Sequence, residues 1–139
     1  MIAVMVLPPS LVFVTWLSLL GIASITGRHP IWSTTPENLS EAAAFGDSVA
    51  VRRYLTRGER IDRAAQVRAG MGRGADTILT PIEAAAAAED EDMVNMLFNL
   101  GAAPDATVWH RAWCVSETAG VREALERGRP PGAVPTSCP

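Results

Sequence analysis

The segment TPIEAAAAAEDEDMVNMLFNLGA, residues 80–102, carries the pattern that decides the fold. Its first half places alanine three and four residues after an isoleucine, and its second half places an apolar pair three and four residues after a valine. These spacings match the α-helical turn and predict two short amphipathic helices joined by a turn. Thr80 is placed to cap the first helix, Pro81 to occupy its first turn, and Gly101 to end the second.

The same pattern occurs twice more, 43 residues earlier and 27 residues later. The three copies align at Leu39, Ile82 and Trp109; Ala42, Ala85 and Ala112; Val51, Val94 and Val121; Gly58, Gly101 and Gly128. Helix pairs of this size cannot bury their apolar faces alone, so we expect them to stack on one another. The predicted copies cover about 36–62, 79–105 and 107–128, with a long finger at 61–79 between the first two.

The run Thr80-Pro81-Ile82-Glu83-Ala84-Ala85-Ala86, followed by Gly101-Ala102, resembles the ankyrin repeat. The resemblance implies an all-α solenoid of about three ankyrin-like helix pairs that binds other proteins through finger tips and first helices. Glu83 replaces the histidine of the family motif, Trp113 stands where alanine is expected, and two further features depart from the family. Glu89-Asp90 stands where glycine is usual, and the offsets of 43 and 27 residues differ from the family period of about 33.

Residues 1–27 contain no charged side chain. A membrane-spanning helix needs about 20 predominantly apolar residues, so we predict a single transmembrane helix at about 9–26. A linker at 28–35 would follow this anchor, and Arg28 favours a cytoplasmic repeat domain. A cleaved signal peptide and a buried core helix are the alternatives for this segment. The Pro-rich tail at 129–139 is predicted to be disordered.

The charges are unevenly distributed along the 139-residue chain, although its net charge is only −3. Seven arginines and two acids lie between residues 52 and 73, whereas seven acids and no base lie between 74 and 105. This composition excludes a generally basic nucleic-acid binder, and two cysteines are too few for a disulfide scaffold. Solvated helix faces would explain the charges, but an arginine-bearing finger also suits a protein contact.

The favoured function is a membrane-tethered adaptor or scaffold whose partner is another protein. The candidate contact residues on the finger at 63–77 are Arg63, Arg68, Met71 and Arg73. Those on exposed positions of the first helices are Ser40, Glu41 and Glu83. Nucleic acid is not favoured, because no aromatic residues interleave with the arginines. Anionic lipid headgroups are a weaker alternative.

No catalytic site, metal site or cofactor is predicted, and we expect the protein not to be an enzyme. His110 and Cys114 are four residues apart and would share a helix face, as a thiol–imidazole pair or two metal ligands would. His110 aligns with the structural histidine of the ankyrin motif, so an enzyme using His110 and Cys114 is a remote alternative. The main alternative to the membrane-tethered adaptor is a secreted or periplasmic binding protein that is released by cleavage of a signal peptide. Cys114 and Cys138 could be free thiols or a disulfide.

Overall fold

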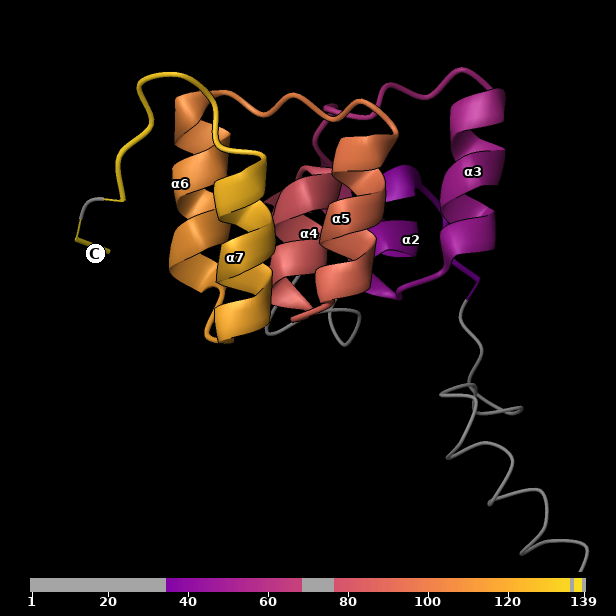
Figure 1. Cartoon of the computed structure of the whole chain (residues 1–139). Helices are drawn as coiled ribbons and strands as arrows, with labels where there is room; N and C mark the ends of the chain where they lie inside the picture. Colours follow the sequence, from indigo (N-terminus) through magenta and orange to yellow (C-terminus); the bar gives the residue numbers. More distant parts are fainter. Residues whose placement is uncertain (1–34, 69–76, 136, 139) are drawn as a thin grey trace, which may run out of the picture. The chain divides into compact units, whose positions relative to one another are not determined.

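The protein is described by a computed structural model that covers residues 35–68, 77–135, 137 and 138. The chain divides into a unit at 1–35 and a unit at 36–139, and only the second is considered below. Its described ranges contain α2 (Leu39–Ala44), α3 (Ser48–Thr56), β1 (Ala65–Val67), β2 (Thr77–Leu79), α4 (Pro81–Ala87), α5 (Glu91–Asn99), α6 (Ala106–Val115) and α7 (Ala119–Arg127). In Figure 1 the helices stand in a row, with α3 at one end and α6 at the other.

Consecutive helices form three pairs, and the pairs stack through their first helices. α4 packs between α2 and α6, and α5 packs on α7. α3 packs on α2 and makes less contact with α5 than α5 makes with α7.

The apolar positions that align the three copies lie in the core of the stack. Their side chains are all nearly or fully buried, including Leu39, Ile82 and Trp109 at the start of the first helices and Val51, Val94 and Val121 in the second helices. Alanines fill the contact between first helices, where Ala42, Ala85 and Ala112 are fully buried. Small side chains let neighbouring helices approach closely, which explains the abundance of alanine in this segment.

Two strands correct the expectation of an all-α fold. β1 and β2 pair antiparallel, with Ala65 opposite Leu79 and Val67 opposite Thr77, and they form the two arms of the predicted finger. The extra residues between the first two copies supply enough chain for a hairpin, and β-branched residues in its arms favour extended backbone. The described part of the unit therefore combines six helices with a two-stranded sheet.

The transmembrane helix expected at 9–26 lies outside the described residues, as does most of the linker. Among the described residues, no helix is long and apolar enough to cross a membrane. Over the described residues, the expected all-α solenoid is therefore replaced by a stack of helix pairs that carries a two-stranded hairpin.

The C-terminal tail, predicted to be disordered, is attached to the last helix pair. The Ala133 backbone N–H donates to the Pro130 carbonyl oxygen at 3.2 Å, and the Ala133 side chain is buried in the core cluster. Cys138 forms a disulfide with Cys114 near the end of α6. In Figure 1 the tail runs beside α6 on the side turned away from α4.

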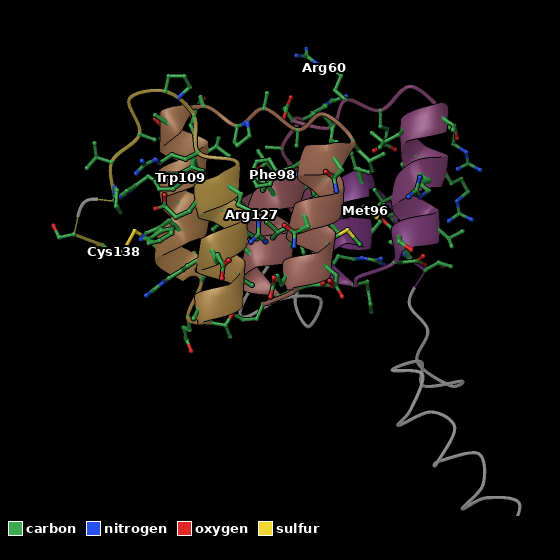
Figure 2. The ribbon with its side chains drawn as sticks, viewed as in Figure 1. Arg60, Met96, Phe98, Trp109, Arg127 and Cys138 are labelled. Carbon is green, nitrogen blue, oxygen red and sulfur yellow. A yellow bond between two sulfur atoms is a disulfide. The ribbon has the colours of Figure 1, made fainter. Side chains whose placement is uncertain are left out.

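Gly128 ends α7 for a reason that differs from the expected left-handed turn. Its φ is −99°, which other residues can adopt. A Cβ atom at this position, however, would lie 2.2 Å from the Phe98 ring. Close approach between the second and third pairs therefore requires glycine here, and Figure 2 shows Phe98 beside α7.

Candidate protein-binding surface

The two strands of the finger are held by polar side chains at the start of α2. Asn38 Nδ2 donates to the carbonyl oxygen of Gln66 in β1 at 2.8 Å. Ser40 Oγ donates to the carbonyl oxygen of Leu79 in β2, also at 2.8 Å. Because one carbonyl of each strand is bound, the base of the finger is fixed to the first helix pair.

Glu41 binds the end of β1 through an ion pair with Arg68. The Arg68 side chain donates to Glu41 twice, from Nε to Oε1 at 2.7 Å and from Nη2 to Oε2 at 2.8 Å. Two backbone N–H groups also donate to the Glu41 carboxylate, that of Arg68 to Oε1 at 3.2 Å and that of Glu37 to Oε2 at 2.8 Å. Burial raises the pKa of Glu41, but the hydrogen bonds and charge of Arg68, with the backbone donors, outweigh burial and hold the pKa below its ordinary value. The carboxylate therefore remains charged and anchors the finger.

Glu83 links the second and third helix pairs. Its Oε2 accepts hydrogen bonds from the Thr80 backbone N–H at 2.9 Å and the Thr80 hydroxyl at 2.7 Å, which completes a capping box at the start of α4. Its Oε1 lies 2.5 Å from Nε of Arg111 on α6, and this hydrogen bond raises the pKa of Arg111. Glu83 aligns with Ser40 in the repeat, so this position joins neighbouring elements in both copies.

The expected exposure of three candidate contact residues is corrected by these interactions. Ser40, Glu41 and Glu83 are 0%, 1% and 3% exposed, because their polar atoms are used inside the stack. The structure brings Ser40, Glu41 and Arg68 together at the finger base, where they position the finger and are not available to a partner.

Of the other predicted contacts, Arg63 is exposed in the loop before β1. Arg68 is half-buried beside Glu41. Met71 and Arg73 lie outside the described residues, so their places on the finger remain predictions.

Five exposed arginines lie on α3 and on the loop that leads to the finger. They are Arg52, Arg53, Arg57, Arg60 and Arg63, and we call them the arginine surface. No ion pair in the described part of the chain involves any of them, whereas the arginines at 68, 111, 127 and 129 each bind a carboxylate. In Figure 2 nitrogen-tipped side chains project from α3 on the side away from the other helices, and Arg60 points away from the stack.

Tyr54 packs beneath the guanidinium groups of Arg53 and Arg57, two members of the arginine surface. Its ring is buried, its hydroxyl donates to the Pro36 carbonyl at 2.5 Å, and the guanidinium carbons of Arg53 and Arg57 lie 5.6 and 5.9 Å from the ring centroid. Contacts of this kind hold the two stems while the charges remain in solvent. The charges are therefore partly ordered before any partner arrives.

Glu89 is a structural residue that the sequence interpretation missed. It has a φ of 58°, in the left-handed region, and aligns with Gly46 of the first copy. Its carboxylate accepts hydrogen bonds from the backbone N–H groups of Glu117 and Thr118 at 2.6 and 3.0 Å, at the start of α7. Thr118 makes no side-chain cap of its own, so Glu89 caps the helix of the next pair. The sequence did carry a sign of this role, because Glu89 is an acidic residue at a position where the first copy of the repeat has glycine.

A hollow of about 250 Å³ lies between the starts of α3 and α5. It is lined by Gly46, Ser48, Asp90, Asp92, Met93 and Met96. Two carboxylates give this hollow a charge opposite to that of the arginine surface, and Figure 2 shows Met96 directed from α5 toward α3. The two sides of α3 thus differ in charge.

His110 and Cys114 share a face of α6, as the spacing predicted. The two ring nitrogens of His110 lie 3.7 and 3.9 Å from Cys114 Sγ, but this sulfur is bonded to Cys138 and is not a free thiol. Among the described residues, no group of three or more His, Cys, Asp or Glu side chains could hold a metal ion.

Comparisons of the chain with protein-family models, curated proteins and solved structures find no match. Functional inference therefore depends on the geometry described above.

Proposed function

We propose that this chain is a protein-binding module of ankyrin-like helix pairs, and that the arginine surface binds an acidic segment of its partner. The observation that supports this proposal best is the absence of any ion pair to these five exposed arginines in the described part of the chain. Charges that a stable fold does not use are available to a partner of opposite charge, which they attract and orient.

Arginine is suited to a carboxylate-rich protein segment. Its planar guanidinium binds a carboxylate through two parallel hydrogen bonds, and it is less strongly hydrated than lysine. Arg53 and Arg57 are one helical turn apart on α3, so their guanidinium groups can meet carboxylates from successive turns or alternate residues of a partner. Arg60 and Arg63 are exposed in the loop that follows α3 and leads to β1.

An acidic protein is favoured over single-stranded nucleic acid because the surface lacks stacking platforms. Nonspecific binding of single strands combines a basic groove with exposed aromatic rings. Tyr54 is only 8% exposed and is covered by Arg53 and Arg57. The chain is also acidic overall, which weakens attraction to a long polyanion.

The proposal can be tested with a synthetic peptide of alternating glutamate and leucine, labelled for fluorescence anisotropy. The full chain is compared with R52Q/R53Q/R57Q, and R122Q/R127Q/R129Q removes the same charge from the other end of the stack. Three ion pairs at about 0.5–1 kcal/mol each should give a loss of affinity of at least about tenfold in the first variant only. The affinity should also decrease with added salt.

Equal binding by both variants would contradict the proposal. So would tighter binding of a short single-stranded DNA or of phosphatidylserine vesicles than of the peptide, because either result would identify another class of partner. Sedimentation at low salt tests for self-association. Dimers that disappear in R52Q/R53Q/R57Q would make a second copy the occupant and overturn the proposal of a separate partner.

A second proposal concerns the compartment and follows from the disulfide. Disulfides persist in oxidising compartments and are rare in the cytosol. The Cys114–Cys138 bond therefore supports the alternative in which the repeats function outside the cytoplasm. Alkylation of intact cells before and after reduction should label both cysteines only after reduction, and immediate labelling would contradict this placement.

A further inference from the structure

We propose that the Cys114–Cys138 disulfide is a thiol–disulfide exchange site, at which an external dithiol attacks Cys138 and His110 stabilises Cys114 as the leaving group. Its reduction releases the tail from the last helix pair. This inference is independent of the arginine surface, since it concerns the opposite end of the stack.

The two sulfurs of the bond differ in accessibility. Cys138 is exposed, whereas Cys114 is half-buried in the last turn of α6. Exchange requires the attacking thiolate to reach one of the two sulfurs, and the rate depends on which sulfur is attacked. Figure 2 shows Cys138 at the outer end of the molecule. The geometry therefore favours attack at Cys138 and departure of Cys114.

His110 is positioned to assist this departure. It lies one turn before Cys114 on the same helix, with both ring nitrogens within 3.9 Å of the sulfur. A histidine beside a cysteine stabilises the thiolate form, and a thiol that forms a stable thiolate leaves faster. In the described part of the chain, the Cys138 sulfur has no comparable partner besides the disulfide itself.

The exchange can be written as two balanced steps. A thiolate of the dithiol forms a bond to Cys138 Sγ, the Cys138–Cys114 bond breaks, and its electron pair leaves on Cys114 Sγ. The adjacent His110 ring stabilises this thiolate, which then takes a proton from water. The second thiol of the reductant, as thiolate, then attacks its own sulfur in the mixed disulfide and releases Cys138 as a thiolate. The dithiol is oxidised to its disulfide, and both cysteines are reduced.

Reduction should detach the tail because few other described interactions hold it. These are the Pro130–Ala133 turn, the buried Ala133 side chain and the ion pair between Arg129 and Glu126. The disulfide closes a loop across a separation of 24 residues, and its removal restores conformational freedom to the released chain. The released tail then no longer lies against α6 at this end of the stack.

The first test uses the oxidised full-length chain and a limiting amount of glutathione, so that the mixed disulfide can be trapped before a second glutathione reduces it. Mass spectrometry after acid quenching should locate glutathione on Cys138. The rate of reduction by dithiothreitol is then compared for the wild-type chain, H110Q and H29Q, the last of which removes the other histidine. We expect H110Q to slow reduction by about three- to tenfold and H29Q to leave the rate unchanged.

Hydrogen exchange tests the release of the tail. The Ala133 amide should be protected in the oxidised chain and should exchange rapidly after reduction, as it should in C138S. Glutathione on Cys114, an unchanged rate in H110Q, or equal protection of Ala133 before and after reduction would each overturn the proposal. The first and third results are obtained with the wild-type chain, so they do not depend on the folding of a variant.

Discussion

Loss of the Arg68 side chain should destabilise the protein by leaving a buried carboxylate without its main partner. In R68Q, Glu41 loses hydrogen bonds from Nε and Nη2 but keeps the two backbone donors. Removing one member of a buried ion pair costs about 3–5 kcal/mol, and the partial exposure of Arg68, at 36%, reduces this value. We expect a loss of about 2–3 kcal/mol in the free energy of unfolding.

The measurement is urea denaturation of the full chain followed by far-ultraviolet circular dichroism. E41Q/R68Q serves as the matched control, since it removes both charges and keeps similar side-chain volume. The double variant should recover at least half of the loss, because a neutral amide is less costly to bury than an unpaired carboxylate. If R68Q were within about 0.5 kcal/mol of the wild type, the proposed anchoring of the finger by this pair would be refuted.

The ion pair between Glu41 and Arg68 also predicts that the stability of the protein depends on pH. The pKa of Glu41 is lowered in the folded state, so its stabilising effect is fully present above the unfolded-state pKa of about 4.3 and is lost as pH falls through the folded-state pKa. The stability difference between the wild type and E41Q should therefore shrink below about pH 4. A difference that stays constant from neutral to acid pH would contradict this assignment.

Substitutions at Glu89, Gly128 and Trp109 test contacts between and within the helix pairs by urea denaturation. E89A should lower the free energy of unfolding by about 1–2 kcal/mol, because α7 loses its cap. E89G should lose about 1 kcal/mol less than E89A, because glycine adopts the left-handed backbone of this position without strain. A larger loss in E89G than in E89A would contradict this interpretation. G128A should lower the free energy of unfolding by about 1–3 kcal/mol, because the added methyl group clashes with Phe98. F98L/G128A should recover part of this loss. A G128A variant as stable as the wild type would exclude the clash. W109F should cost about 1–3 kcal/mol, because the Leu125 carbonyl oxygen loses the indole N–H that donates to it at 2.8 Å; an unchanged midpoint would show that this bond is dispensable.

The helix pairs could be predicted from the sequence because their pattern is local. An apolar residue followed by alanine at three and four positions defines a helix face without reference to the rest of the chain. The aligned positions Ile82, Ala85 and Val94 are all buried, as are their counterparts in the other copies. The offset between copies also located the long finger.

The hairpin and the tail attachment could not be predicted in the same way. Each strand has only three residues, and pairing between Ala65 and Leu79 depends on a contact across the finger. Short strands carry little periodicity, so their conformation is determined by tertiary contacts. Cys114 and Cys138 were left open between thiols and a disulfide, because sequence separation does not reveal distance in the fold.

The burial of Ser40, Glu41 and Glu83 was missed for a related reason. Their polar side chains suggested exposed helix positions, but each has a partner far along the chain. Ser40 binds the Leu79 carbonyl, 39 residues away, and Glu83 binds Arg111, 28 residues away. A buried polar residue is predictable only when its partner can be identified, and neither partner lies within the same helix.

The most direct test of the proposed function is an NMR titration of the full chain with the glutamate–leucine peptide, which follows the arginine side-chain Nε–H signals and the backbone amides. We predict that the shifts concentrate on Arg52, Arg53, Arg57, Arg60, Arg63 and the amides of α3, and that they disappear at high salt. Shifts that concentrate on α6 and α7 would contradict the account, because binding would then use the other end of the stack, where Arg111 and Arg127 already bind carboxylates.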